Sequence, residues 1–247
     1  MAEIETGAAA PRTRWKRILL KLSGEALAGD KGFGIDGGVV ERIAGEIAEA
    51  VALGVQVGVV VGGGNLIRGA QIAAKGGDRV AGDHMGMLGT IMNCLALHGA
   101  LTHLKVSSTV LSALAVPAVC ETFTQRAALR CLAQGDVMLF AGGTGNPFFT
   151  TDTGAALKAA EIGCDALLKG TQVDGIYTAD PKKDPTATRY ERLTHSEVLE
   201  RGLAVMDAAA IALARDNNIP VIVFSIQQPG ALIDVLTGRG RATIVDG

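Results

Sequence analysis

The stretch Asp136-Val-Met-Leu-Phe-Ala-Gly-Gly-Thr-Gly-Asn-Pro-Phe-Phe-Thr-Thr-Asp152 decides the fold, because an apolar run gives way to glycines, hydroxyls and one carboxylate. Residues 136–140 are typical of a buried strand, and residues 151–162 have helical spacing, with Thr and Asp at the start as capping residues. The glycines between them let backbone N–H groups approach a ligand. This unit predicts an anion or nucleotide cradle, with an ordinary glycine-rich turn as the alternative.

The same alternation of short apolar runs and helical periods extends along the chain. Strands are predicted at residues 17–21, 55–61, 105–111, 136–140, 166–169, 220–225 and 242–245. Helices are predicted at residues 39–53, 83–103, 124–133, 151–162, 194–202, 207–217 and 229–238. This alternation predicts an α/β fold, a three-layer αβα sandwich with a central, mostly parallel sheet.

One polar stretch, from Gly170 to Leu193, interrupts the alternation. It contains Pro181 and Pro185 and too few apolar residues for a core element. Loops of this length are usually functional or disordered, so we expect one of the two here.

Length and charge narrow the class of protein. The chain has 247 residues, 48% of them hydrophobic and 19% charged, which suits one large domain or two small ones with a substantial core. Its net charge of −2 gives no global electrostatic reason to expect nucleic acid or an anionic membrane as a partner. Residues 1–14 contain no apolar segment of signal-peptide length, so we expect a disordered tail on a cytosolic protein.

Cysteines and histidines give no sign of a disulfide framework or a metal site. The four cysteines are widely spaced without a C-x-x-C pair, and we expect buried free thiols in a reducing compartment. The four histidines show no metal-ligand spacing.

Three glycine-rich turns follow predicted strands and therefore share the carboxyl edge of the sheet, where ligands bind in open α/β folds. They are Lys21-Leu-Ser-Gly24, Gly62-Gly-Gly-Asn65 and residues 141–151. None has the Walker A pattern or the G-x-G-x-x-G spacing. Three glycine-rich turns at one edge suggest more phosphate groups than one nucleotide carries. This favours a phosphoryl donor and a phosphoryl acceptor whose phosphate groups face each other at that edge.

Charged residues near these turns favour phosphoryl transfer, whose transition state is stabilised by positioned cations and backbone donors. Lys21 and Lys169 close strands, and Arg68 follows the triple glycine. Asp152 is placed to orient a lysine or to hold Mg²⁺ through water. The alternative is that the lysines are solvated strand ends and that Asp152 is a structural N-cap.

Five motifs together carry a resemblance to a known family. They are Lys21-Leu-Ser-Gly-Glu-Ala-Leu27, Gly62-Gly-Gly-Asn65 with Arg68, Gly82-Asp-His-Met-Gly-Met87, Gly143-Thr-Gly-Asn-Pro-Phe-Phe-Thr-Thr-Asp152 and Val173-Asp-Gly-Ile-Tyr-Thr-Ala-Asp-Pro181. In this order the chain resembles the bacterial UMP kinases (uridylate kinases) of the amino acid kinase family, from about Trp15 to the C-terminus. The resemblance implies an amino acid kinase-like fold with a single domain at residues 15–247. Residues 15–165 would form its UMP half and residues 166–247 its ATP half.

The resemblance also implies the reaction ATP + UMP → ADP + UDP, in de novo pyrimidine nucleotide (CTP/UTP) biosynthesis. Mg²⁺ would accompany ATP, held by nucleotide phosphates and water without a direct protein ligand. The catalytic residues would be Lys21, Arg68, Asp152 and Lys169. ATP would be bound by Lys21, Leu22, Ser23, Gly24, Gly64, Arg68, Thr171, Tyr177 and Asp180. UMP would be bound by Gly63, Asp83, Thr144, Gly145, Asn146, Pro147, Phe148, Phe149, Thr150 and Thr151.

Regulation in such enzymes implies further partners. The resemblance implies a cytoplasmic homohexamer that UTP inhibits and that GTP activates at a site between subunits, with no membrane and no need for nucleic acid. The segment that lies near the effector region in such enzymes is present in this chain, as Gly29, Asp30, Lys31, Gly32, Phe33 and Gly34. Relatives often carry Arg-Asp where this chain has His98-Gly99, and a basic residue near Thr109 is absent, so the usual GTP contacts do not carry over. Gly170 and Gln172 replace a more typical Ala and Lys, which we expect to change ATP affinity modestly.

Two other functions stay open. A related kinase acting on carbamate, glutamate or aspartate would share the scaffold, but Asp83 and residues 143–151 weigh against it because a small acid needs no ribose contact. A non-catalytic or bifunctional sensor of pyrimidine nucleotides would bind UMP or UTP and contact a regulatory partner. The four retained charged residues weigh against a loss of catalysis.

Overall fold

The computed structural model of the chain describes residues 12–68, 74, 76–203 and 205–247, which form one nine-stranded sheet with helices around it. The strands are β1 (Arg17–Leu22), β2 (Gln56–Val61), β3 (Ser108–Ser112), β4 (Glu121–Thr122), β5 (Val137–Ala141), β6 (Ala166–Thr171), β7 (Arg192–Leu193), β8 (Val221–Ser225) and β9 (Ala242–Val245). Their order across the sheet is β4-β3-β5-β2-β1-β6-β8-β9-β7. Neighbours run parallel except β8 and β9, so the sheet is mostly parallel, as predicted.

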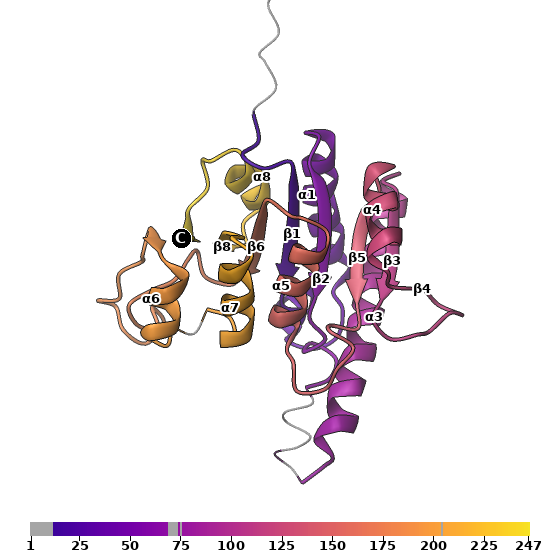
Figure 1. Cartoon of the computed structure of the whole chain (residues 1–247), viewed down its shortest axis with the longest axis horizontal. Coiled ribbons are helices and arrows are strands. Elements are labelled where there is room, and N and C mark those ends of the chain that lie inside the picture. The colour runs from indigo at the N-terminus through magenta and orange to yellow at the C-terminus, as the bar shows by residue number, and fades with distance from the viewer. Residues whose placement is uncertain (1–11, 69–73, 75, 204) are drawn as a thin grey trace, which may run out of the picture.

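Helices cover both faces of the sheet (Figure 1). One layer contains α1 (Gly37–Ala52), α3 (Arg79–His103) and α8 (Ala231–Leu236). The other contains α4 (Gln125–Ala133), α5 (Thr151–Glu161), α6 (His195–Glu200) and α7 (Ala208–Asp216). Two short 3₁₀ helices, η1 (Gly24–Leu27) and η2 (Gly29–Lys31), follow β1. The predicted three-layer αβα sandwich is confirmed.

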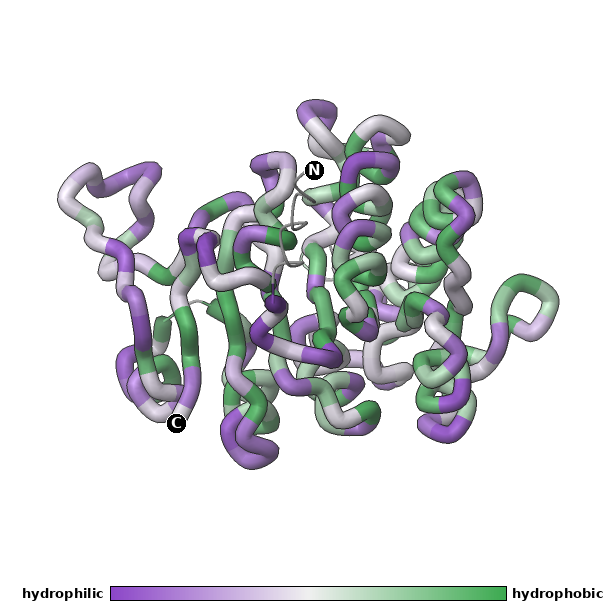
Figure 2. The backbone as a smooth tube through the Cα atoms, turned by 90° about the horizontal axis from the view of Figure 1, so that it is seen from above, coloured by the Kyte–Doolittle hydropathy of each residue, from purple (hydrophilic) through white to green (hydrophobic). Residues whose placement is uncertain are grey.

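Each central strand is buried on both of its faces. On β1, Leu20 joins the apolar cluster under α1 and α3, whereas Leu19 joins the cluster under α5 and α7, and both side chains are fully buried. Figure 2 shows hydrophobic segments through the middle of the molecule and hydrophilic loops toward its edges. Burial on both faces makes the apolar runs continuous instead of alternating, which is why these strands stand out in the sequence.

A few boundaries differ from those predicted, for local reasons. α3 begins at Arg79 and not at residue 83, because the Asp78 carboxylate caps it by accepting from the next backbone N–H groups. β3 begins at Ser108 and not at residue 105, because Lys105 takes a left-handed backbone conformation, with φ of 59°, where α3 ends. The two-residue strands β4 and β7 were not predicted, since such short pairs leave no periodic signal.

Three of the four cysteines are buried, as the sequence predicts. Cys94, Cys131 and Cys164 are buried free thiols, and Cys120 is half-buried. Burial raises the pKa of the Cys94 and Cys164 thiols to about 12. These two thiols are therefore uncharged and unreactive near neutral pH.

The start of the chain and α3 bear on two further predictions. Most of the predicted disordered tail lies outside the described residues; within them, the backbone N–H of Arg14 donates to the carbonyl oxygen of Leu236. By length and composition alone, α3 is apolar enough to cross a membrane. In the fold it packs on the sheet and buries Cys94, Leu97 and Leu101, as a core helix does.

Replacing Phe224 by alanine tests the packing of the α1–α8 layer. The ring is fully buried in the cluster that joins β8 to α1 and α8, so Phe224→Ala should lower the free energy of unfolding by about 3–5 kcal/mol. Phe33 is 70% exposed, and Phe33→Ala should change stability by less than about 0.5 kcal/mol. Urea unfolding measures both variants, and equal losses would contradict this account of the layer.

Candidate active site

Glycines bring the turn after β1 into close contact with the turn after β2. A Cβ on Gly24 would lie 2.6 Å from the carbonyl oxygen of Gly62 and 2.8 Å from the backbone nitrogen of Gly64. A Cβ on Gly63 would lie 2.3 Å from the carbonyl oxygen of Gly86 in α3. Any side chain would force these backbones apart, so glycine is required for the close approach.

Two lysines stand side by side next to these turns. β1 and β6 are parallel neighbours, and their register pairs Lys21 with Lys169. Both side chains point to the α5 layer, because Leu19 and Leu167, two residues earlier on each strand, belong to its apolar cluster. Asp152, in the first turn of α5, lies between them, with Oδ1 2.7 Å from Lys21 Nζ and Oδ2 2.8 Å from Lys169 Nζ. We call these three residues the Lys–Asp–Lys cluster.

Burial and charge set the protonation of the cluster. Burial disfavours the charged form of Asp152, but the ammonium groups of Lys21 and Lys169 outweigh it and lower the pKa of this carboxyl. Burial also lowers the pKa of Lys169, which Asp152 opposes and Lys21 reinforces. With both lysines protonated, the cluster carries net positive charge beside the N-terminus of α5, where the helix dipole also favours an anion.

A second carboxylate, Asp207, holds the turn that precedes α5. Thr150 is the N-cap of α5, and its hydroxyl accepts from the backbone N–H groups of Asp152 and Thr153. The alternative in which Asp152 is a structural N-cap is therefore wrong, because its carboxylate is turned toward the lysines. Asp207, the N-cap of α7, accepts from the hydroxyls of Thr150 and Thr153.

A cavity of about 260 Å³ opens between the glycine turns and the first turns of α3. Six of the residues predicted to bind UMP line it: Gly63, Asp83, Thr144, Phe149, Thr150 and Thr151. Gly64, predicted for ATP, lines the same cavity. Gly86, Met87 and Gly143 line it too and stand in the quoted motifs without an assigned nucleotide, whereas Ile67 and Thr90 lie outside those motifs. The remaining predicted residues, Gly145, Asn146, Pro147 and Phe148, belong to the same loop but do not line the cavity.

Asp83 ties α3 to this loop. Arg79, one turn earlier on α3, donates to both carboxylate oxygens of Asp83 over 2.9 and 2.8 Å. The backbone N–H of Phe148 donates to the same carboxylate over 2.8 Å, and Phe148 has a left-handed backbone with φ of 72°. The carboxylate is thereby fixed at the cavity wall.

A larger cavity, of about 680 Å³, lies on the other side of the Lys–Asp–Lys cluster. Its lining includes Lys169 and the predicted ATP residues Thr171, Tyr177 and Asp180. The Tyr177 hydroxyl donates to Asp174 over 2.6 Å, which holds the ring on the long polar loop. Lys169 lines this cavity and Thr151, the neighbour of Asp152, lines the smaller one, so the cluster lies between the two.

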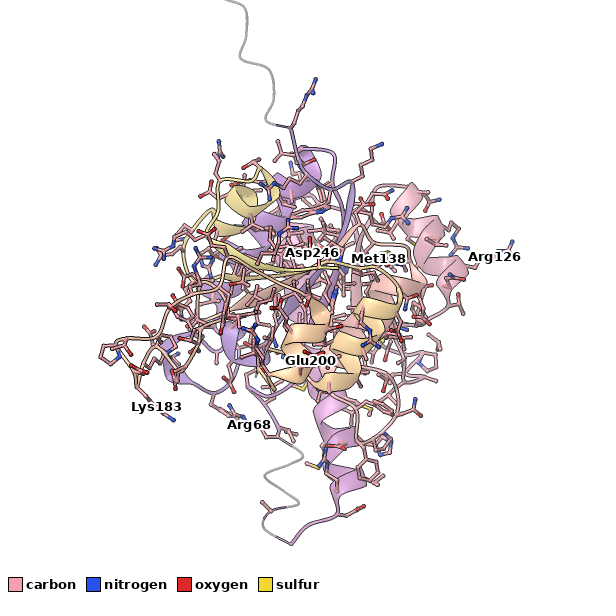
Figure 3. The ribbon with its side chains drawn as sticks, turned by 60° about the vertical axis from the view of Figure 1, so that its left-hand side comes forward. Arg68, Arg126, Met138, Lys183, Glu200 and Asp246 are labelled. Atoms are coloured by element: carbon pink, nitrogen blue, oxygen red, sulfur yellow. The ribbon has the colours of Figure 1, made fainter. Side chains whose placement is uncertain are left out.

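The other residues predicted for ATP lie on the turn after β1 or beside it. Leu22 ends β1 in the apolar core, and the Ser23 hydroxyl caps η1 by accepting from the N–H of Ala26. Arg68 forms an ion pair with Glu25. Figure 3 shows Arg68 and Lys183 both on the lower left side of the molecule. The structure therefore places Arg68 near this edge of the sheet with its guanidinium held by a carboxylate.

Known proteins share this architecture over nearly the whole chain. The model of the amino acid kinase family matches residues 16–225. The chain belongs to the amino acid kinase family. A uridylate kinase of Agrobacterium fabrum is 68% identical over 231 residues, which cover 94% of this chain and 96% of that protein. A uridylate kinase of Brucella abortus is 66% identical with the same coverage.

Solved structures of UMP kinases have the same fold as this chain. The crystal structure of UMP kinase from Bacillus anthracis has a TM-score of 0.90 at 40% identity and covers 94% of this chain and 96% of its own. UMP kinase from Ureaplasma parvum has a TM-score of 0.90 at 40% identity, covering 95% of this chain and 100% of its own. The resemblance to bacterial UMP kinases within the amino acid kinase family is confirmed.

Polar residues of α3 that no sequence motif marked hold the turns of this amino acid kinase fold. The Asn93 amide donates to the carbonyl oxygen of Gly62 over 2.7 Å, and the Thr90 hydroxyl accepts from the backbone N–H of Gly142 over 2.7 Å. Both side chains are buried. The signal that could have found them is a polar residue on the buried face of an apolar helix, which needs a partner for its hydrogen bonds.

The predicted effector segment of this amino acid kinase is attached to the triple-glycine turn. The N–H of Gly34 donates to the carbonyl oxygen of Asn65 over 2.9 Å, and the Asn65 amide donates back to the carbonyl oxygen of Gly34 over 2.7 Å. Asn65 is itself buried and bonded to Asn93. A GTP role for residues 29–34 stays a prediction.

Asp152→Asn tests the electrostatics of the cluster. The change should lower the free energy of unfolding by about 3–5 kcal/mol near neutral pH, because it leaves two buried ammonium groups without their counter-charge. Without Asp152, the pKa of Lys169 falls further below its unfolded value, so the unfolded state binds more protons and stability rises with pH. The loss should therefore shrink between about pH 7 and 10, below the ordinary lysine pKa.

Thermal unfolding of wild type and variant across this pH range measures the effect. Asp216→Asn is the control, because Asp216 is exposed and pairs only with the neighbouring Arg215 among the described residues. A loss for Asp152→Asn that stays constant with pH would contradict the account.

Proposed function

We propose that this amino acid kinase transfers the γ-phosphoryl group of ATP to UMP, giving ADP and UDP. The observation that carries the proposal is the Lys–Asp–Lys cluster, which lies between a cavity of about 260 Å³ and one of about 680 Å³. Relatives named uridylate kinase, matched over 94% of this chain, support the choice of nucleotide. In de novo pyrimidine synthesis this reaction would supply UDP for UTP and CTP.

ATP is assigned to the larger cavity. Tyr177 and Asp180 lie on the polar loop at its wall, where an aromatic ring and a carboxylate suit adenine and ribose. Lys169 lines the same cavity. A triphosphate that extends from the loop toward Lys169 would bring its γ-phosphorus to the cluster.

UMP is assigned to the smaller cavity. Asp83 at its wall is an acceptor for ribose hydroxyls, and backbone and hydroxyl groups of Thr144 and Thr150 offer neutral hydrogen bonds to the base. Phe148 and Phe149 are 66% and 54% exposed, which leaves aromatic surface available to a bound pyrimidine. Loop residues 145–148 would contact UMP without lining the empty cavity.

In this proposal, the rate enhancement comes from neutralising the charge on the phosphate groups and from aligning the two nucleotides. The second phosphate pKa of UMP is near 6, so its phosphate is already a nucleophilic dianion at neutral pH and no strong general base is needed. Lys21 and Lys169 would contact the transferred phosphoryl group and stabilise the charge that spreads over its oxygens. Asp152 holds both ammonium groups beside the transferred phosphoryl group. Arg68, which follows the turn after β2, would add a third positive charge there.

Mg²⁺ would arrive with ATP. Among the described residues, no three His, Cys, Asp or Glu side chains gather to hold a metal ion, and both Asp152 oxygens lie against ammonium groups. In this proposal the nucleotide phosphates and water hold the ion, which offsets negative charge on the phosphate oxygens. Asp152 is the nearest carboxylate for its water ligands in this proposal.

The finer points of assembly and control belong to the same proposal. We place the enzyme in the cytoplasm as a homohexamer. UTP would inhibit it, and GTP would act on it by binding at residues 29–34. A single domain at residues 15–247 would hold UMP mainly through residues 15–165 and ATP mainly through residues 166–247. The single continuous sheet supports one domain.

Lys21→Ala tests the role of the cluster. Turnover should fall by roughly 10²–10³-fold, the usual cost of losing one charge-stabilising group in a transition state, while UMP binding stays largely intact. Lys16→Ala is the control, since Lys16 is exposed just before the start of β1. Steady-state kinetics and UMP titration measure both variants; unchanged turnover in Lys21→Ala would defeat the assignment.

A panel of acceptors with ATP and Mg²⁺ tests the substrate. UMP should be phosphorylated in preference to CMP, dTMP and carbamate. Asp83→Asn should raise the KM for UMP roughly tenfold, the size of one lost hydrogen bond to a charged group, while Asp180→Asn should raise the KM for ATP instead. Binding of UMP without phosphorylation of any acceptor would favour a nucleotide sensor.

A further inference from the structure

A second cationic cavity lies on the opposite face of the sheet from the Lys–Asp–Lys cluster. It has a volume of about 270 Å³, and its lining includes Arg14, Arg189 and Arg241. Ile222 and Val235, also in its wall, belong to the apolar cluster of the α1–α8 layer, whereas the cluster lysines point to the α5 layer. The cavity is therefore separated from the proposed reaction centre by the sheet.

Positive charge dominates this cavity. Three guanidinium groups line it, against one carboxylate, Glu191. No ion pair joins Glu191 to these arginines among the residues that the structure describes. Arg241 has one partner, with its Nε 3.1 Å from Asp174 Oδ2, and remains 74% exposed. Guanidinium groups stay protonated at any physiological pH, so this charge is permanent.

Arg189 is held in the wall of the cavity by two contacts. Its Nη1 donates to the carbonyl oxygen of Ala242, and its stem packs on Gly175, where a Cβ would lie 2.7 Å from Arg189 Cδ. These contacts hold the side chain in place. Its Nε is buried and has no hydrogen-bond partner in the described part of the chain. Because the Nε is buried, an anion in the cavity would instead be bound by the Nη groups of this guanidinium, whose position the Ala242 contact already fixes.

We propose that Arg14, Arg189 and Arg241 bind a small phosphate anion in this cavity. The planar donor forks of arginine match phosphate oxygens two at a time. Several forks around one cavity suit the tetrahedral oxygens of phosphate or pyrophosphate better than the two oxygens of a carboxylate. Arg14 and Arg241 are exposed, so an anion can reach them from solvent, although Arg241 would exchange its ion pair with Asp174 for the anion; Arg189 is already held.

An intrinsic fluorophore lies at this cavity. Its single tryptophan, Trp15, lines the cavity. Lys21 is six residues further along an extended chain, roughly 20 Å away at the usual strand rise. Tryptophan fluorescence therefore reports on this cavity and not on the Lys–Asp–Lys cluster.

Titration of the full chain with inorganic pyrophosphate, without Mg²⁺ and at constant ionic strength, tests the proposal. Wild type should show a saturable change in Trp15 emission, and inorganic phosphate should give the same change at higher concentration. Arg14→Gln and Arg189→Gln should each raise the half-saturating concentration about tenfold or more, the usual effect of losing a charge-assisted hydrogen bond. Arg126→Gln, an exposed residue of α4 (Figure 3), should leave it unchanged.

Lys21→Ala separates this site from the proposed function. The fluorescence response should persist in that variant, because Lys21 lies across the sheet. A response lost in Lys21→Ala, or an equal response to sodium chloride alone, would overturn the proposal, as would no saturable change in wild type. Since Arg14 is exposed, Arg14→Gln decides the matter even if Arg189→Gln does not fold; an unchanged titration in Arg14→Gln refutes the site.

Discussion

The structure depends on one electrostatic constraint, two ammonium groups held side by side on neighbouring strands. Parallel pairing of β1 with β6 places Lys21 next to Lys169, and burial and the charge of Lys21 both lower the pKa of Lys169. Asp152 offsets this cost through contacts of 2.7 and 2.8 Å. The N-terminus of α5 must therefore lie against both strands, which fixes how that helix sits on the sheet.

The same edge also needs backbones that approach without side chains. The glycines after β1 and β2 leave no room for a Cβ against each other or against α3. Buried polar groups of α3, Thr90 and Asn93, then satisfy backbone groups of the glycine turns. Close approach and hydrogen bonding together leave N–H groups and cations facing the two cavities, which is the environment that phosphate groups require.

Contacts across the site join its two sides. Asp207 at the start of α7 accepts from Thr150 beside the smaller cavity, and Lys169 of the larger cavity donates to the carbonyl oxygen of Val205. The segment that leads into α7 thus contacts both the turn before α5 and a cluster lysine. In a phosphoryl transferase this arrangement keeps donor and acceptor pockets in a fixed relation, on which in-line transfer depends.

The sequence by itself determined the layers, the glycine turns and the charged residues at the sheet edge, because strands buried on both faces are continuous apolar runs and phosphate chemistry needs glycine and cations. It could not show that Thr150 caps α5 while Asp152 joins two lysines, since that choice depends on the register of β1 and β6. Asp207, Thr90 and Asn93 stayed hidden for the same reason, because their partners are tens of residues away. Only the tertiary structure decided which distant groups meet, since a hydrogen bond or ion pair requires proximity in space that local sequence does not record.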